Sequence, residues 1–164
     1  MQIGVMSDSH DSMPMVKKAI GILNERNVAL VLHAGDIVSP FIPRLFADLE
    51  APMVVTFGNN DSERELLRKR FSDLGKNVKG LFTEVEIGRI RLAMTHGDET
   101  ELLLSLIKSQ YYHVVVHGHT HEAKTYVSGN TLVVNPGEIC GYLSGQSTMA
   151  LLDAETRTTK MLQL

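Results

Sequence analysis

Acidic and histidine side chains gather in five short segments that also contain glycine, asparagine or serine. Those segments are Asp8-Ser9-His10, Gly35-Asp36, Gly58-Asn59-Asn60-Asp61, Thr95-His96-Gly97 and Gly118-His119-Thr120-His121. Carboxylate, imidazole and amide oxygen together suit divalent ions such as Mn, Fe, Zn and Ni. None of the segments contains cysteine, which argues against a structural zinc site of the cysteine type. The set therefore predicts a metal centre.

Taken singly, each segment has a simpler interpretation. The first three fit helix caps and turns, and Asp61 or Ser62 is expected to cap the helix that follows them. His96 by itself is a weak signal. The pair His119 and His121, which flank one residue after an apolar strand, is more specific. The metal prediction therefore depends on the order and the placement of the whole set.

Strands and helices alternate in the first half of the chain. Apolar residues recur at helical spacing between residues 13 and 25, and continuous apolar runs are typical of strands buried on both faces. The patterns predict strands at 2–6, 28–33 and 53–57, and helices at 13–25, 41–49 and 62–73. Each of these strands runs directly into one of the first three segments.

The second half is mostly strand. The patterns predict a hairpin of 81–87 with 90–95, a helix at 99–108, strands at 112–117, 123–128 and 131–135, and a hairpin of 147–153 with 157–163. The organisation predicts one α/β domain over residues 1–164, with a mainly parallel sheet and a second, more antiparallel sheet. Ligands of open α/β sheets bind at the carboxyl ends of the strands, so the five segments are expected to converge there.

Composition narrows the class of protein. The chain has 164 residues, of which 43% are hydrophobic, and 16 basic residues against 19 acidic ones give a net charge of −3. A protein that binds nucleic acid by charge alone is basic, so this class is disfavoured. The first residues lack the pattern of a signal peptide, no apolar run is long enough to span a membrane, and the single cysteine, Cys140, gives no sign of an oxidising compartment. A cytoplasmic location is expected, without membrane attachment.

In this order, the five segments resemble the calcineurin-like metallophosphoesterase superfamily. Its pattern is Asp-x-His, Gly-Asp, Gly-Asn-His-Asp or a variant, a lone His, and Gly-His-x-His. The small size and the segment Asn135-Pro136-Gly137 further resemble the compact prokaryotic phosphodiesterase branch that includes the YfcE-like enzymes. The resemblance implies a four-layer sandwich of two mixed β-sheets flanked by helices. It also implies metal-dependent hydrolysis of phosphate esters, with phosphodiesters as the favoured substrates.

The resemblance also assigns roles to seven residues. The first metal ion would be held by Asp8, His10 and His121, the second by Asn59, His96 and His119, with Asp36 bridging the two. Manganese is the expected ion, and nickel, iron and zinc are alternatives. A pair of such ions activates water to hydroxide near neutral pH, and the hydroxide attacks phosphorus in line.

Two positions depart from the family pattern. Asn60 stands where many members have a histidine that contacts the scissile phosphate, so it is the expected catalytic residue. Asparagine can donate a hydrogen bond there but cannot act as a general acid near pH 7. We therefore expect substrates with good leaving groups, such as aryl or nucleotidyl diesters. Glu138 stands where the branch often has serine. It is interpreted either as a hydrogen-bond partner of a metal ligand or as a surface residue, and the surface is favoured. His33 is as well explained by orienting a ligand as by packing, and His117 is expected to face either the core or the site.

Three functions remain open at this point. The leading one is a phosphodiesterase acting on a small phosphate ester. A phosphomonoesterase or nucleotide phosphohydrolase uses the same chemistry, because specificity lies in loop shape. A protein-binding scaffold, as in one eukaryotic sorting-complex subunit of this fold, is disfavoured because all seven positions carry competent ligand types. Self-association through exposed sheet faces or edges is a further expectation.

Overall fold

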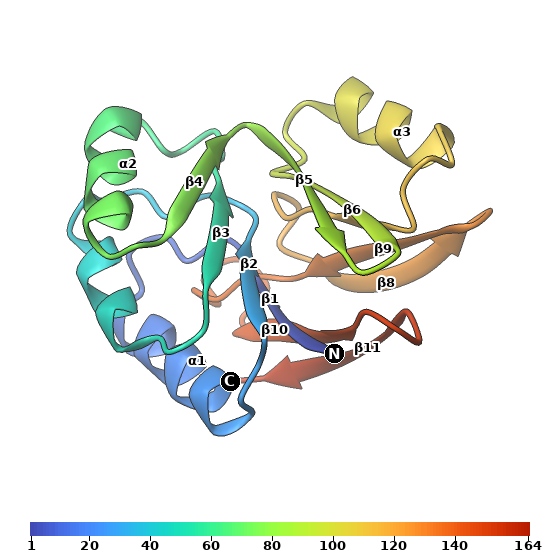
Figure 1. The fold of residues 1–164 in the computed structure, drawn as a ribbon. Coiled ribbons are helices and arrows are strands. Elements are labelled where there is room, and N and C mark those ends of the chain that lie inside the picture. Colours follow the sequence, from blue (N-terminus) through green and yellow to red (C-terminus); the bar gives the residue numbers. More distant parts are fainter.

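The computed structural model describes all residues 1–164 and consists of four layers (Figure 1). Two mixed β-sheets pack face to face, and helices cover the outer face of each sheet. This arrangement confirms the expected α/β sandwich.

The first sheet has six strands in the order β11-β10-β1-β2-β3-β4. Its four parallel strands are β1 (Gln2–Met6), β2 (Leu30–His33), β3 (Met53–Thr56) and β4 (Asn77–Gly80), and the antiparallel pair is β10 (Thr148–Asp153) and β11 (Thr158–Gln163). The helices α1 (Met13–Glu25) and α2 (Arg64–Asp73) and the 3₁₀ helix η1 (Ile42–Asp48) lie against its outer face.

The second sheet has five strands in the order β5-β6-β7-β9-β8. They are β5 (Phe82–Ile87), β6 (Ile90–Thr95), β7 (Val114–Val116), β8 (Ala123–Ser128) and β9 (Thr131–Pro136), and the helix α3 (Thr100–Lys108) covers this sheet. The strands β6, β7 and β9 are parallel, so β6 and β7 end at the same edge of the sheet.

Side-chain alternation along the strands builds the layers. Ile3 and Val5 of β1 point between the sheets, where they meet Val114 and Val116 of β7. Val115 points the other way and packs under α3. The apolar run of β7 is continuous because both of its faces are buried.

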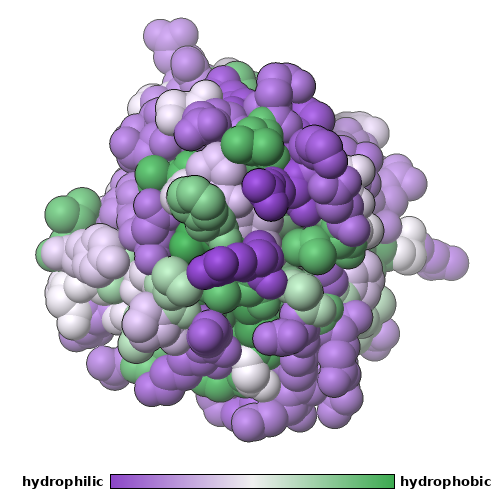
Figure 2. Space-filling model, turned by 90° about the vertical axis from the view of Figure 1, so that its left-hand side faces the viewer, coloured by the Kyte–Doolittle hydropathy of each residue, from purple (hydrophilic) through white to green (hydrophobic).

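The helix α1 forms where the spacing predicts it. Its buried residues Val16, Ala19, Ile20 and Leu23 recur every three or four positions and face the first sheet. Pro14 stands in the first turn, where its missing N–H costs no hydrogen bond. The far side of this layer, which carries α1, η1 and α2, is mostly hydrophilic, with separate apolar areas between (Figure 2).

Three elements differ from the prediction. The strand β4 was not predicted, because only Val78 among its four residues is buried and it lies at a sheet edge. The expected short helix at 41–49 is a 3₁₀ helix. Asp61 does not cap α2, whose N-cap residue is Glu63. Instead, the side chain of Asp61 is buried against the loops that follow β2 and β3.

No helix of the chain combines the length and the apolar character that crossing a membrane requires.

Candidate metal centre

The loops that follow β1, β2, β6 and β7 bring buried acids and histidines together. Ligand atoms of Asp8, Asp36 and His96 lie within 4.8 Å of one another, and so do those of Asp8, His10 and His121. Asp8 belongs to both groups, so the two sets form one continuous cluster. The expected convergence at the strand ends is therefore present.

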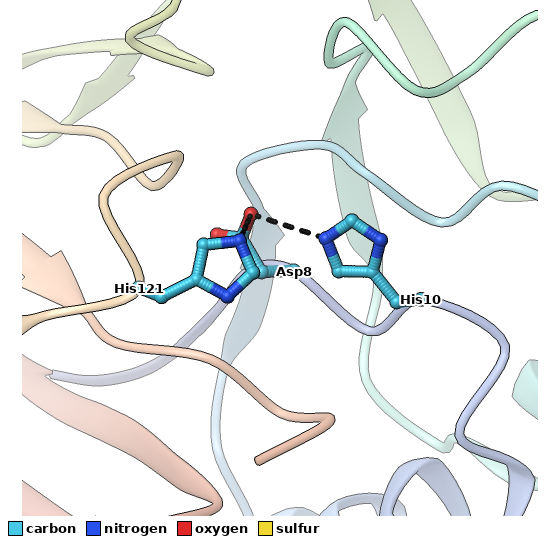
Figure 3. A group of neighbouring side chains, drawn as sticks. All are labelled: Asp8, His10 and His121. Atoms are coloured by element: carbon cyan, nitrogen blue, oxygen red, sulfur yellow. Dashed lines mark ion pairs between the residues drawn. The ribbon is translucent and has the colours of Figure 1, made fainter. Parts of the chain in front are cut away.

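The first group has Asp8 at its centre. His10 and His121 approach its carboxylate from two sides (Figure 3). Their Nε2 atoms lie 3.7 Å and 3.3 Å from Asp8 Oδ1, and the two rings stack with centroids 5.2 Å apart. Three donor atoms thus point at one small volume.

The second group is formed around Asp36. His96 Nε2 lies 3.2 Å from Asp36 Oδ2 and 4.0 Å from Asp8 Oδ1, and His10 Nε2 lies 3.5 Å from Asp36 Oδ2. The ring of His119 lies beside that of His96, with centroids 5.2 Å apart. Asp36 therefore faces His10 of the first group as well as His96 of its own.

The hydrogen bonding of His96 fixes which of its nitrogens faces the acids. Its Nδ1 lies 2.7 Å from the carbonyl oxygen of Ala34, and a carbonyl can only accept, so Nδ1 carries a proton. In the neutral ring, Nε2 then directs a lone pair toward the carboxylates. The lone pair of Nε2 and those of the carboxylate oxygens then repel each other, unless a cation or proton lies between them.

Several of these atoms have no partner within the chain. Asp8 Oδ1, His10 Nε2 and His96 Nε2 are buried and make no hydrogen bond. Unpaired buried polar atoms are rare, because each costs about 1–3 kcal/mol. All three face the same volume, and their donor types suit divalent transition metals. The residues therefore fit a metal ion.

The electrostatics agree with this fit. Burial favours the neutral ring of His96, but the Asp36 and Asp8 carboxylates outweigh it and raise the pKa of His96 from 6.5 to about 9. Burial opposes ionisation of Asp36, yet His96 and Asn60 hold the pKa of that carboxyl well below its usual range. Without metal, a proton on His96 supplies the positive charge that the acids attract.

A family model described as the calcineurin-like phosphoesterase superfamily domain matches residues 1–157. The chain belongs to this superfamily. Its activity is accordingly the metal-dependent hydrolysis of phosphate esters, and the expectation of this family is confirmed.

Known relatives agree with the family. A phosphodiesterase of Methanocaldococcus jannaschii is 44% identical over 158 residues, which cover 96% of this chain and 95% of that protein. A solved structure described as a novel archaeal phosphodiesterase superposes on this chain over 100% of both chains, with 43% identity and a TM-score of 0.96. The phosphoesterase Yfce of E. coli shares the fold alone, at 17% identity and a TM-score of 0.72 over 99% of this chain and 98% of that one.

The site is built on loops, and the loop backbone is strained. Asp8, His10, Asp36, His119 and His121 all have positive φ, between 36° and 68°. Side chains with a Cβ rarely adopt this region, and such residues cluster at functional sites. The surrounding structure must therefore hold the loops in place.

Asp61 holds two of these loops. Its buried carboxylate accepts four backbone N–H bonds of 2.8–2.9 Å, from Asp36, Ile37, Val38 and Gly58. Val38 is β-branched and has a φ of 80°, which is unfavourable without such a tie. One side chain thus fixes the loop after β2 against the loop after β3.

His33 is part of the same support, and it does not face the cluster. It is fully buried, which lowers its pKa to about 4 and keeps the ring neutral. Nδ1 accepts from Gly35 N, so Nε2 carries the proton and donates to Ser9 Oγ at 3.2 Å. His117 is also buried, and its Nδ1 donates to the carbonyl of Gly118. Both histidines therefore position the loops that carry the clustered acids and histidines.

The two asparagines are placed differently from each other. The side chain of Asn60 donates to Asp36 Oδ2 and its backbone N–H donates to Oδ1, both at 2.8 Å. Asn59 is exposed, and its side chain makes no hydrogen bond within the chain. Asn60 thus orients the carboxylate of Asp36, while the amide of Asn59 has no hydrogen-bond partner within the chain.

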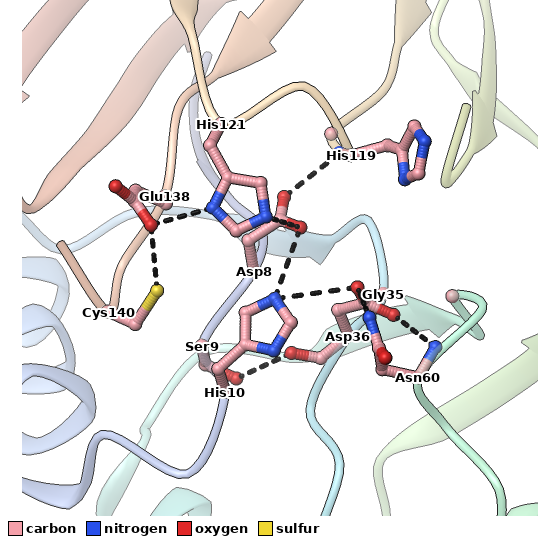
Figure 4. A network of polar contacts seen from close by, with 12 residues as sticks. Asp8, Ser9, His10, Gly35, Asp36, Asn60, His119, His121, Glu138 and Cys140 are labelled. Atoms are coloured by element: carbon pink, nitrogen blue, oxygen red, sulfur yellow. Dashed lines mark hydrogen bonds and ion pairs between the residues drawn. The ribbon is translucent and has the colours of Figure 1, made fainter. Parts of the chain in front are cut away.

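The prediction that Glu138 lies on the surface is wrong. Its side chain is fully buried, and Oε2 accepts from His121 Nδ1 at 2.6 Å (Figure 4). Buried carboxylates need such partners. The bond leaves Nε2 of His121, which faces Asp8, as the atom with a free lone pair, so Glu138 orients a proposed metal ligand.

Sequence reasoning favoured the surface for Glu138, because neither its bond to His121 nor the shape of the turn that follows it can be read from residue types. Besides His121, it accepts from Cys140 Sγ at 2.9 Å and from the backbone of Tyr142, Leu143 and Ser144. A usable signal was present: an acidic residue directly after Asn-Pro-Gly, in a loop of otherwise uncharged residues.

Replacement of Glu138 by glutamine is expected to weaken Mn²⁺ binding by about 10- to 100-fold, the usual effect of losing such a partner. The amide can offer an N–H to Nδ1, which favours the tautomer with the proton on Nε2. Calorimetric titration of Mn²⁺ measures this. The control is Glu122→Gln, an exposed residue beside His121. Equal Mn²⁺ affinity in Glu138→Gln and the wild type would contradict the assignment.

The carboxylates of Asp36 and Asp8 rest against glycines. A Cβ on Gly58 would collide with Oδ1 of Asp36 and lie 2.7 Å from its backbone nitrogen, and a Cβ on Gly118 would lie 2.5 Å from Asp8 Oδ2. Both distances are far below ordinary contact. These glycines therefore make room for the acids.

Gly58→Ala is accordingly expected to displace Asp36 and lower Mn²⁺ affinity about tenfold or more. Gly21→Ala is the matched control, because Gly21 lies within α1 and a Cβ there meets nothing within 4 Å. That control should gain about 0.5–1 kcal/mol of stability and keep its affinity. Urea unfolding and metal titration measure both; retained affinity in Gly58→Ala would argue against the close packing.

Proposed function

We propose that the chain is a phosphodiesterase whose reaction takes place at a two-ion site. Asp8, His10 and His121 would hold one ion, Asn59, His96 and His119 the other, and Asp36 would bridge them. The observation that carries the proposal is the set of buried, unpaired atoms on Asp8, His10 and His96 that face one volume.

Bound divalent ions would supply positive charge for the phosphoryl group and lower the pKa of a bound water to near neutrality. The chain itself places the ligands. Glu138 and Ala34 set the tautomers of His121 and His96, and Asn60 fixes both oxygens of Asp36. Because these supports are built into the protein, little reorganisation is needed during the reaction.

The alternatives differ in what they require of this site. A scaffold has no use for buried unpaired ligand atoms on strained loops, since each of them costs stability. A phosphomonoesterase would have to accommodate a dianion. No lysine or arginine belongs to the cluster of acids and histidines, which favours the singly charged diester.

The test is hydrolysis by protein stripped with a chelator and reloaded with Mn²⁺, Ni²⁺, Fe²⁺ or Zn²⁺. We expect hydrolysis of bis(4-nitrophenyl) phosphate to return with Mn²⁺ and to exceed that of 4-nitrophenyl phosphate. Asp36→Asn should lower kcat/KM by about 100-fold or more. Asp48→Asn, an exposed aspartate of η1, is the control. Inactivity of the reloaded wild type toward every diester would sink the proposal.

A second experiment addresses the leaving group. Asn60 lacks an acidic proton, so departure of a poor leaving group is unassisted. Asn60→His is expected to raise the ratio of kcat/KM for alkyl diesters to that for aryl diesters. Asn60→Ala is the control, because it removes the same bond to Asp36 without adding an acid. If the ratio in Asn60→His equals that in Asn60→Ala, leaving-group protonation at this position is excluded.

Four further statements stay predictions: manganese as the native ion, a cytoplasmic location, one domain over residues 1–164, and self-association. Metal analysis of protein purified without chelator and sedimentation analysis test the first and the last. The substrate is proposed to be a small phosphate ester, with nucleotides as the alternative class.

A further inference from the structure

We infer that Tyr142 and Leu143 form a platform beside the metal centre, which binds a planar aromatic group of the phosphodiester. The inference deepens the proposed function and depends on it. It concerns the loop of residues 137–147, which leads from β9 in the second sheet to β10 in the first.

The two side chains are exposed to an unusual degree. Leu143 is 75% exposed, the highest value among the large hydrophobic residues, and its neighbour Tyr142 is 64% exposed. Single exposed apolar residues are common on protein surfaces. Two adjacent ones at the rim of a functional site are more specific, because ligand sites combine apolar walls with a few polar groups.

A shallow hollow connects this pair to the proposed ligands. It is lined by His10, Asn60, His121, Cys140, Tyr142 and Leu143, and its volume is about 210 Å³. Pockets that enclose drug-sized molecules have roughly 300–1,000 Å³, so this one suits a single ring with a phosphate at its edge. A phosphoryl group at the ions would place its organic substituent in this hollow.

The platform is held rigidly, although it lies in a loop. The backbone N–H groups of Ile139 and Cys140 donate to the carbonyls of Ser7 and Asp8. The turn beyond is fixed by Glu138, whose carboxylate accepts from the N–H groups of Tyr142 and Leu143 at 3.1 Å and 3.0 Å. Preorganisation of this kind lowers the entropy cost of binding. The exposed pair is thus presented in a defined place.

The position fits a substrate group better than a protein partner. The hollow reaches inward to His10 and His121, which a protein covering the loop would close to substrate. Tyrosine also offers a flat face on which aromatic rings stack, with about 0.5–1.5 kcal/mol gained beyond burial. An aryl group and a nucleobase share this chemistry, so both belong to the ligand class.

The test measures binding without turnover, on Mn²⁺-loaded protein, by calorimetry with phenylphosphonate and methylphosphonate. We expect the wild type to favour the phenyl compound by about tenfold and Tyr142→Ala to reduce that preference by about 3- to 10-fold. Leu143→Ala should reduce it less, and Tyr142→Phe should recover most of it. Val127→Ala, which removes an equally exposed apolar side chain on β8, is the control.

The outcomes separate the possible errors. A preference that is absent in the wild type, or unchanged in both Tyr142→Ala and Leu143→Ala, overturns the platform. The platform is also overturned if these variants sediment differently from the wild type but keep its preference for phenylphosphonate, because Tyr142 and Leu143 would then belong to a protein contact. Adenosine and ribose 5-monophosphates, compared in the same way, tell a nucleobase from other aryl groups. Inactivity toward all diesters sinks the proposed function and leaves the phosphonate comparison to be judged separately.

Discussion

The central constraint on this molecule is the crowding of negative charge and lone pairs between Asp8, Asp36 and their histidines. Two buried carboxylates and the Nε2 atoms of His10, His96 and His121 face one volume, with separations of 3.2–4.0 Å. Such a cluster is unfavourable unless a cation neutralises it. The raised pKa of His96 has the same cause, because a proton on its ring supplies positive charge to the two carboxylates.

The fold serves this constraint by supplying rigid points from which the loops project. The parallel strands β1, β2 and β3 end side by side in one sheet, and β6 and β7 end side by side in the other. Backbone bonds then join loops of different strands, as between Asp8 and Gly35 or Gly118 and His96. Residues with strained backbone angles can persist here because hydrogen bonds from neighbouring loops hold them in place. Asp61 and His33 are examples: neither belongs to the cluster of acids and histidines, and both fix loops that carry its members.

The sequence predicted what local patterns control. Helix α1 has the predicted bounds, since four apolar residues at helical spacing specify both its span and its buried face. The five ligand segments were placed at strand ends because an apolar run followed by a polar residue is visible in any sequence. The short strand β4 was missed, because one buried side chain, Val78, gives no period to detect.

The site was predicted as far as residue type reveals function. Ligand types are recognisable, whereas supporting residues depend on what surrounds them after folding. Asp61 was expected to cap a helix and instead accepts bonds from two loops. Glu138 was expected in solvent, because an isolated carboxylate is costly to bury. Its burial becomes favourable only when His121 and the turn at Tyr142–Ser144 are already in place, and an acidic residue after Asn-Pro-Gly does not by itself reveal that arrangement.

Glu138 also joins two parts of the enzyme that could have been independent. One carboxylate bonds to His121, a proposed ligand, and to the turn that presents Tyr142 and Leu143. An ion bound at His121 would make its ring more acidic and strengthen the bond from Nδ1 to Glu138. The stronger bond would restrict the motion of the carboxylate that also accepts from the N–H groups of the turn. Metal occupancy and the conformation of the platform formed by Tyr142 and Leu143 are thus expected to change together, through the single buried side chain of Glu138.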